Sequence, residues 1–263
     1  MRRFLSLLWS LLALVAASSH AAGPFTVCFE EWQPYAWVNP AGQAYGPSID
    51  IYRQALRQAG IPTVAFKEMQ YNRCSEQVKQ GLVDMKLFVL DNELPGQPQL
   101  HEPTEYWQIA AIVRQDSPLQ HYQGLSDFER ARLALITGYL YPEPLDAFIR
   151  THAWSASDPT HAYRLIASKR VDAVFLDLLA FEQRNRTLRL PLRPLQPVVA
   201  RLPVFAVLSS RHQELSKALD AVIGQMREQG EIDRLYRLYT GRTLAQWLHY
   251  AGPVEGTTPS KTP

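Results

Sequence analysis

The chain has 263 residues, of which 46% are hydrophobic and 20% are charged, a composition typical of an ordinary globular protein. Its formal net charge is +2, and removal of the first 21 residues, which include Arg2 and Arg3, brings that charge to zero. A balanced charge argues against nucleic acid or an acidic membrane surface as a partner. The length is sufficient for two small lobes, each with its own core.

The N-terminal segment has the pattern of a secretory signal. Arg2 and Arg3 precede a short apolar run at 5–17, and small residues follow at Ser19 and Ala21. This pattern predicts export to the periplasm with cleavage after Ala21. The alternative is an uncleaved membrane anchor, but the apolar run is short for a span and Ser10 interrupts it.

In chain order, the apolar periodicity first predicts an α/β unit. Strands are expected at 25–29, 64–66, 85–90 and 107–113, and helices at 47–60 and 73–80. The loop at 30–45 is rich in aromatic residues, Pro and Gly, and a second loop follows at 91–104.

A second α/β unit is expected to follow the first. Its predicted strands are 133–137 and 171–176, and its predicted helices are 144–152 and 160–168. Residues 198–208 are typical of a strand that returns to the first unit, and helices are expected at 215–226 and 232–238. The polar, Pro-rich stretch 250–263 has little to bury and is expected to be disordered.

A helix-to-strand switch occurs twice, around Val83-Asp84 and again around Val171-Asp172. This repetition indicates two α/β lobes, and the cleft between two lobes is a common place for a small ligand. We expect lobe 1 to comprise 22–113 plus 202–249 and lobe 2 to comprise 114–201. The two crossings near 113 and 202 predict a two-strand hinge on which the lobes close.

The two cysteines, Cys28 and Cys74, are an even number in an exported chain, which favours one disulfide. They are predicted at the first strand and near the start of the second helix, a reasonable geometry for a bridge. The alternative is two buried free thiols. A metal site is less favoured, because neither cysteine has a histidine at ligand spacing.

Several motifs in series resemble the periplasmic solute-binding proteins of polar-amino-acid ABC importers. The matching segments are 46–52, 80–84, the aromatic pair 106–107, the glycine turn 138–141 and the segment 170–177. The resemblance covers nearly the whole mature chain. It implies a type II periplasmic-binding fold, with two α/β lobes joined by a two-strand hinge.

The sequence departs from this family at one position that matters for the ligand. Family members that bind α-amino acids usually have an arginine after the strand that follows the Gly-x-Val-Asp motif, and it pairs with the ligand carboxylate. The corresponding stretch here, 90–96, contains no arginine, so that bidentate clamp cannot form there.

The candidate ligand-binding residues combine aromatic rings, carboxylates and a glycine turn: Glu31, Trp32, Tyr35, Tyr71, Gly138, Tyr139, Tyr141 and Asp177. The aromatic rings can stack on an apolar or cationic ligand, or else pack beneath their loop. Gly138 can expose backbone N–H groups to an anion. Asp177 matches the family position that meets the ligand amine, and it can also cap the helix that begins at Leu178.

Together these features predict a monomeric periplasmic protein that captures a small, amino-acid-like or amine-bearing solute and delivers it to an inner-membrane permease. No cofactor, metal or catalytic residue is predicted, because the sequence has none of the common catalytic motifs. Two alternatives stay open. One is an enzyme on the same fold, like the cyclohexadienyl dehydratases, and the other is a ligand sensor that docks to a membrane receptor.

Overall fold

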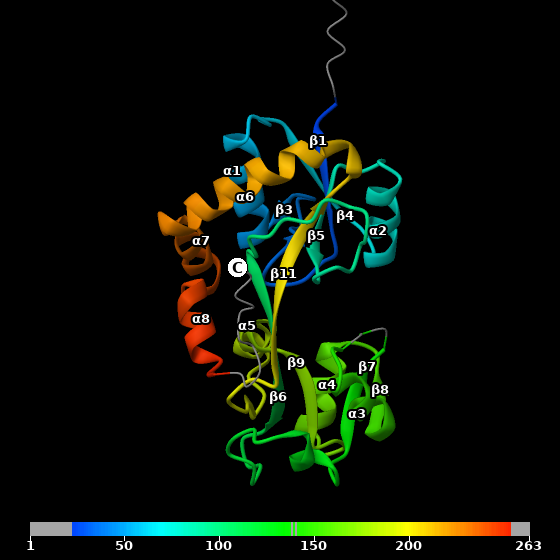
Figure 1. Ribbon diagram of the computed structural model, residues 1–263. Coiled ribbons are helices and arrows are strands. Elements are labelled where there is room, and N and C mark those ends of the chain that lie inside the picture. Colours follow the sequence, from blue (N-terminus) through cyan, green and yellow to red (C-terminus); the bar gives the residue numbers. More distant parts are fainter. Residues whose placement is uncertain (1–22, 138, 140, 254–263) are drawn as a thin grey trace, which may run out of the picture.

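The computed structural model describes residues 23–253 except 138 and 140. The predicted signal segment and most of the predicted tail lie outside this part of the chain. The described chain folds into an upper and a lower α/β lobe connected by two long strands (Figure 1). Within it, none of the helices has the length and apolar character that a membrane span requires.

Lobe 1 begins as a parallel sheet with helical crossovers. Its parallel strands, in spatial order, are β4 (Val64–Glu68), β1 (Phe25–Phe29) and β5 (Met85–Val89). Helix α1 (Pro47–Gln58) connects β1 to β4, and helix α2 (Tyr71–Lys79) connects β4 to β5. Because the strands are parallel, their carboxyl ends lie at one edge of the sheet.

The entry to α1 requires a glycine. Gly46 precedes the helix with φ 126°, and a Cβ there would lie 2.3 Å from the carbonyl oxygen of Tyr35. Pro47 then takes the first helical position, where its missing N–H has no cost. Before this point, β2 (Trp37–Val38) and β3 (Ala44–Tyr45) form a short hairpin within 30–45, which the sequence predicts to be a loop.

The C-terminal part of the chain returns to cover lobe 1. After the turn η2 (Ser210–His212), the helices are α6 (Gln213–Glu228), α7 (Glu231–Thr240) and α8 (Leu244–Tyr250). Their apolar side chains pack with α1 on one face of the sheet, in the largest core of the molecule. Helix α8, which the sequence did not predict, runs down the side of the molecule toward lobe 2 (Figure 1).

Lobe 2 is a second sheet with helices on both faces. Its strands, in spatial order, are β6 (Glu105–Arg114), β9 (Ala173–Asp177), β7 (Leu133–Ile136) and β8 (Ala153–Ala156), with β10 (Leu192–Pro194) also on β6. Its helical elements are η1 (Leu125–Phe128), α3 (Leu145–His152), α4 (Pro159–Ala167) and α5 (Leu178–Leu188). Separate apolar cores lie on the two faces of this sheet.

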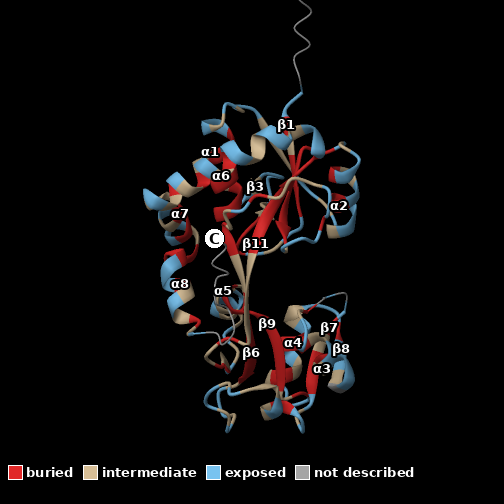
Figure 2. Ribbon diagram, viewed as in Figure 1, coloured by how far each residue is buried: buried red, intermediate tan, exposed pale blue. Residues whose placement is uncertain are grey.

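Two antiparallel strands join the lobes. In β11 (Ala200–Leu208), residues 200–204 pair with residues 109–105 of β6, and the remaining residues of β11 pair with β5 of lobe 1. The middle of this pair is only half-buried, in contrast to the buried strands on either side (Figure 2). This is the predicted two-strand hinge of the type II fold.

The pairing refines the expected hinge position. Residues 109–113 of β6 already pair with β9, so they belong to the sheet of lobe 2. We therefore propose that the first crossing lies within 105–109, before the expected position at 113, and that the second lies near 202 as expected.

The predicted Cys28–Cys74 disulfide is present, with the Cα atoms 5.8 Å apart. It joins β1 to α2 on the face of the lobe 1 sheet opposite to the large core. Two small apolar clusters lie there, one with Val83 beside the bridge and one with Val78 of α2. The bridge therefore strengthens the face of lobe 1 that has the least apolar packing.

The tail predicted from the sequence, 250–263, starts before the packed part of the chain ends. Ala251 is buried, and its carbonyl accepts a hydrogen bond from the Val198 N–H at 2.9 Å. The Arg201 guanidinium donates to the carbonyl of Gly252 at 2.8 Å. Tyr250, the last residue of α8, donates its hydroxyl to Glu182 of α5 at 2.7 Å. Residues 250–252 are thus packed against lobe 2; 254–263 lie outside the described residues.

Candidate functional site

Asp177 lies where the two lobes meet. It is the last residue of β9 and the N-cap of α5, and its Oδ1 accepts from the Ala180 N–H at 2.7 Å. Its side chain also accepts from the hydroxyl of Tyr35 in lobe 1, at 3.3 Å to Oδ2. The sequence left open a cap or a ligand contact for Asp177; the cap is present, and the ligand contact stays a proposal.

The buried environment of Asp177 destabilises its charged form. The residue is 5% exposed. Burial raises the pKa of its carboxyl to about 7, although hydrogen bonds from the backbone N–H groups of Ala180, Gln108 and Leu179 and from Tyr35 favour the charged form. A cation that replaced the lost water would stabilise the carboxylate, so this position is suited to an amine.

Tyr35 and Trp32 form an aromatic pair on the lobe 1 side. Their ring centroids are 4.3 Å apart, and Trp32 also contacts Phe88 edge-on at 5.2 Å. The Tyr35 ring is buried in the core of lobe 1, so only its hydroxyl remains to act at the interlobe boundary. Trp32 is half-buried and retains the capacity to stack on a ligand.

Glu31, in contrast, points to solvent. Its side chain is exposed and accepts a hydrogen bond from the Gln33 amide at 2.8 Å. The structure gives it no contact with the other candidate residues within the described chain. Its neighbour Glu30, which the sequence analysis did not select, is also exposed, and partial burial raises the pKa of its carboxyl while the nearby Lys86 lowers it.

Two tyrosines of lobe 2 face the same boundary. Tyr141 is buried and stacks on Trp107 at 6.1 Å, and its hydroxyl donates to the Phe175 carbonyl at 3.0 Å. Tyr139 is 38% exposed and lies 6.3 Å from Tyr141, between ring centroids. Tyr139 is therefore the more available of the two to a ligand. Gly138 lies outside the described residues.

The electrostatics of Tyr139 connect the two lobes. The pKa of its hydroxyl is raised first by burial and then by the negative charges of Glu30 in lobe 1 and Asp177 in lobe 2. The Tyr35–Asp177 hydrogen bond joins the two lobes, Trp32 contacts Tyr35, and Tyr139 lies beside Tyr141. We propose that these residues and Glu30 form one candidate site, which we call the interlobe site: Glu30, Trp32, Tyr35, Tyr139, Tyr141 and Asp177.

Tyr71 belongs to a cluster at the edge of lobe 1. It is the first residue of α2, its hydroxyl contacts the carboxylate of Glu93, and its ring lies over the ammonium of Lys86. Burial and the neighbouring Glu93 both raise the pKa of the Tyr71 hydroxyl. The sequence analysis found Tyr71 but missed Lys86 and Glu93. The available signal was a lysine inside the apolar strand 85–89.

A second buried carboxyl group lies beside the hinge. Glu105 is the first residue of β6 and is fully buried, and its Oε2 accepts from the Thr104 hydroxyl at 2.5 Å. Burial raises the pKa of Glu105 to about 7. The hydroxyl of Tyr236 donates to the Thr104 carbonyl at 2.9 Å, so α7 is connected to the start of the hinge strand.

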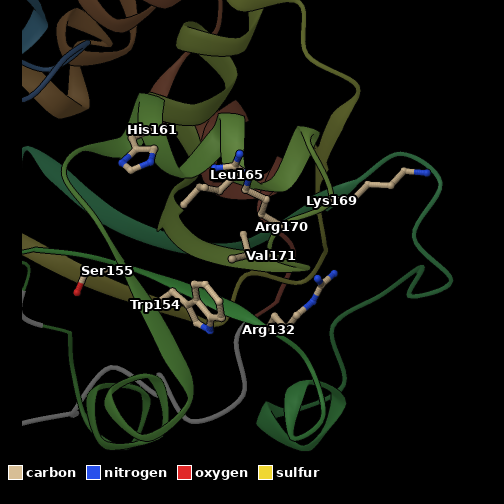
Figure 3. Close-up of a pocket in the computed structure, with 8 residues that line it drawn as sticks. All are labelled: Arg132, Trp154, Ser155, His161, Leu165, Lys169, Arg170 and Val171. Carbon is tan, nitrogen blue, oxygen red and sulfur yellow. The ribbon is translucent and has the colours of Figure 1, made fainter.

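Metal chemistry has no assembled donor set in the described part of the chain. There, no group of three or more His, Cys, Asp or Glu side chains is arranged to hold an ion. The one pocket on the outer face of lobe 2 that Figure 3 shows is lined by basic and apolar side chains, among them Arg132, Trp154 and Arg170. It lies away from the interlobe site and contains none of the candidate residues.

The profile of the bacterial extracellular solute-binding proteins, family 3, matches residues 25–242. The chain therefore belongs to this family, as its motifs indicated. A sequence search of curated proteins finds no match.

Solved structures of similar shape show the same fold. A histidine kinase sensor domain with similarity to periplasmic binding proteins has a TM-score of 0.70 at 20% identity, covering 84% of this chain and 97% of that one. An ancestral arginine-binding protein bound to glutamine has a TM-score of 0.66 at 16% identity, with coverages of 84% and 99%. An ancestral amino acid-binding protein described as a precursor of cyclohexadienyl dehydratase has a TM-score of 0.65 at 17% identity, with coverages of 83% and 95%. At these identities the likeness shows the fold alone.

Proposed function

We propose that this protein captures a small, amine-bearing polar solute between its lobes in the periplasm and delivers it, as a monomer, to an inner-membrane ABC importer. Membership of the solute-binding family and the two-strand hinge support capture by lobe closure. The observation that carries the choice of an amine is Asp177, a buried carboxylate at the interlobe boundary.

The chemistry around Asp177 is that of a cation receptor. A carboxylate only accepts hydrogen bonds, whereas a protonated amine only donates them. The faces of Trp32 and Tyr139 can stabilise the same positive charge from the sides. The stretch 90–96 supplies no arginine, so a carboxylate on the ligand is not bound as it is in most of the family.

Calorimetry on the wild type and Asp177→Asn tests the proposal. The probes are L-lysine and tyramine, together with Nα,Nε-diacetyl-lysine and N-acetyltyramine, the N-acetyl derivatives in which every amine is neutralised. Asp177→Asn preserves the cap of α5 but removes the charge. It should lower affinity for the amines about ten- to over a hundredfold, equivalent to the ~1.5–3 kcal/mol of a hydrogen bond to a charged group.

The matched control is Asp172→Asn, at the other end of the same lobe 2 strand. Asp172 is half-buried and paired with Arg132 at 2.8 Å, outside the interlobe site. This variant should bind the probes as the wild type does. Equal affinities for the wild type and Asp177→Asn would remove Asp177 from the ligand site. Tighter binding of the N-acetyl derivatives than of the free amines would overturn the choice of an amine.

A second candidate function is an enzyme on this fold. The observation that favours it is the presence of two buried carboxyl groups, Asp177 and Glu105, each with its pKa raised to about 7, since a group of this pKa can act as a general acid or base at neutral pH. The likeness to the precursor of a cyclohexadienyl dehydratase names the substrate class to test. Formation of an aromatic product from a cyclohexadienyl acid on incubation with the protein, followed by its ultraviolet absorbance and abolished in Asp177→Asn, would support this function.

A sensor role uses the same binding step but another partner. The likeness to a histidine kinase sensor domain keeps this reading beside the importer. Genes for a permease and an ATPase next to the gene for this protein would support delivery to an importer. A neighbouring sensor kinase gene would support the other reading.

A further inference from the structure

The pocket of lobe 2 in Figure 3 lies at the other end of the lobe from the interlobe site. It adjoins Val171, just before the amino end of β9, whereas Asp177 closes the carboxyl end of the same strand. The chain between these two residues is extended and spans roughly 20 Å. The pocket has a volume of about 420 Å³, a size typical of small-molecule sites. It can therefore hold a ligand of its own.

One wall of the pocket is the ring of Trp154. Strand β8 is the last strand of its sheet, so no other strand of the described chain lies beyond Trp154. Trp154 pairs with Ala134 of β7, whose side chain lies in the core beneath α4, so the indole is on the α4 side, as is Leu165 of the pocket lining. At 66% exposed, the indole leaves a large apolar surface in water. A flat ring inserted between Trp154 and Leu165 would cover that surface.

The charged side chains that line the pocket are basic. Arg132, Lys169 and Arg170 contribute to the lining, and no Asp or Glu of the described chain does. Arg132 donates from Nε and Nη2 to Asp172, at 3.0 and 2.8 Å, so its Nη1 donors remain. The guanidinium of Arg170 makes no ion pair or hydrogen bond within the described residues. The pocket thus offers positive charge and hydrogen-bond donors to an anion.

The turn that carries two of these cations does not need them to form. Helices α4 and α2 end in the same turn, in which a backbone N–H donates to a helix carbonyl at 2.9 Å, from Arg170 in lobe 2 and from Leu82 in lobe 1. The preceding residue is left-handed in both, Lys169 with φ 61° and Gly81 with φ 70°. Glycine adopts this conformation without strain, whereas a side chain disfavours it. Lobe 2 therefore has two cations where glycine and leucine satisfy the fold of lobe 1.

We propose that this pocket is a second binding site, separate from the interlobe site, for a small aromatic anion. The ring of the ligand lies between Trp154 and Leu165. Its carboxylate or phosphate accepts hydrogen bonds from the guanidinium groups of Arg170 and Arg132, whose planar donors match either acid group. Lys169 adds positive charge at the rim. Because the pocket lies within lobe 2, binding here does not depend on lobe closure.

Probes that separate the ring from the charge test this inference by calorimetry. Two aromatic anions, indole-3-acetate and 1-naphthyl phosphate, are compared with the neutral indole-3-acetamide and 1-naphthol and with the ring-free acetate and phosphate. At least one aromatic anion should bind the wild type about tenfold or more tightly than both its neutral and its ring-free counterpart.

Two variants each remove one half of the site. Arg170→Met removes the unpaired guanidinium and should abolish the preference for the anion over its neutral counterpart. Trp154→Thr, which retains a residue that favours strands, should abolish the preference over the ring-free anion. The matched control is Arg164→Met, because Arg164 is an exposed arginine of α4 outside the pocket lining. It should retain both preferences.

Lys169→Gly gives lobe 2 the turn of lobe 1, and it keeps the inference testable if another variant does not fold. It should weaken binding of the aromatic anion about two- to fivefold, as expected for an exposed charge. Thermal unfolding followed by circular dichroism should show no loss of stability, since glycine relieves the left-handed backbone.

The inference is wrong if neither aromatic anion binds the wild type more tightly than its neutral counterpart. It is also wrong if Arg170→Met or Trp154→Thr retains the preference that it should lose, since the anion would then bind outside this pocket. Neither result bears on amine binding at the interlobe site, so the proposed function is tested separately.

Discussion

The two lobes fix the start of their central strands in the same way. In lobe 1 the Asp84 carboxylate accepts from the Thr26 N–H at 2.8 Å, and the Asp84 N–H donates to the Thr26 carbonyl at 3.0 Å. In lobe 2 Asp172 and Arg132 make the same reciprocal pair, at 2.9 and 2.7 Å. The Val-Asp repeat of the sequence is therefore a device that locks a strand to its neighbour, far from the interlobe site.

Beyond these anchors the two strands differ in chemistry. Strand β5 carries a buried ammonium at Lys86, whereas β9 is apolar until it ends in the carboxylate of Asp177. Lobe 1 thus buries a cation within its sheet, whereas lobe 2 ends its strand in a buried carboxyl group. The comparison teaches that the repeated part of each lobe builds the scaffold, while the chemistry of the two strands differs beyond it.

The carboxyl groups of the two lobes should give the protein an unusual pH dependence, and this is the largest effect we expect. Asp177 and Glu105 have folded-state pKa values raised to about 7, so the native state binds protons more tightly than the unfolded chain. The free energy of unfolding should therefore fall as pH rises from about 4 to about 7. At about 1.4 kcal/mol per pKa unit, the loss is on the order of several kcal/mol.

The titration of Asp84 changes the free energy of unfolding in the opposite direction. Hydrogen bonds lower its pKa to about 2 despite partial burial, so its stabilisation is present above its unfolded-state pKa and is lost as pH falls toward 2. Urea unfolding of the ligand-free protein from pH 3 to 8 should show a maximum near pH 4 to 5, and Asp177→Asn should flatten the decline above it. A stability that rises steadily from pH 4 to 7 would contradict the two raised pKa values.

The disulfide makes a second difference between the lobes, because the described part of lobe 2 contains no bridge. The bridge closes a loop of sequence separation 46, for which chain entropy predicts about 4 kcal/mol of stabilisation. Replacement of Cys28 and Cys74 by alanine should lower the free energy of unfolding by about this amount. Urea titration of the oxidised wild type and the double variant measures it; coincident curves would show that packing alone holds α2 in place.

The two aspartates that anchor the central strands, Asp84 and Asp172, differ in their burial and in their partners, and this difference can be measured. Asp84 is 7% exposed and also binds Arg211 and His212, whereas Asp172 pairs mainly with the half-exposed Arg132. Asp84→Ala should therefore cost about 3 kcal/mol, and Asp172→Ala only about 1 kcal/mol. Thermal unfolding of both variants under one set of conditions measures the difference. Equal losses would mean that the reciprocal backbone bonds, and not burial, set the value of each anchor.

The sequence was sufficient for the fold because the fold depends on local patterns. Apolar periodicity placed the main strands and most helices within a few residues, and the even cysteine count indicated the bridge. The short strands β2, β3, β8 and β10 were missed, since two to four residues are too few to show a period. Helix α8 was not predicted because its seven residues, about two turns, are too few to show a helical period.

The candidate site was harder to predict, because it depends on contacts between distant residues. Asp177 could be selected from its motif, but the Tyr35 contact, 142 positions away, could not. Tyr35 and Tyr71 are both candidate ligand-binding rings from the sequence. Only the structure shows that the Tyr35 ring is buried in a core, while the Tyr71 ring covers a lysine. The sequence pattern did not single out Lys86, because one charged residue does not change the prediction of an apolar strand.

The central claim is that the two lobes close on one ligand, and small-angle X-ray scattering tests it most directly. The wild type is measured alone and saturated with the probe that binds most tightly in calorimetry. Rotation about the strands at 105–109 and 200–204 should close the rest of lobe 2 onto the lobe 1 edge around the Tyr35–Asp177 contact, so the radius of gyration should decrease on binding. At a probe concentration just sufficient to saturate the wild type, Asp177→Asn should show a smaller decrease. An unchanged radius of gyration, with saturation confirmed by calorimetry, would contradict closure.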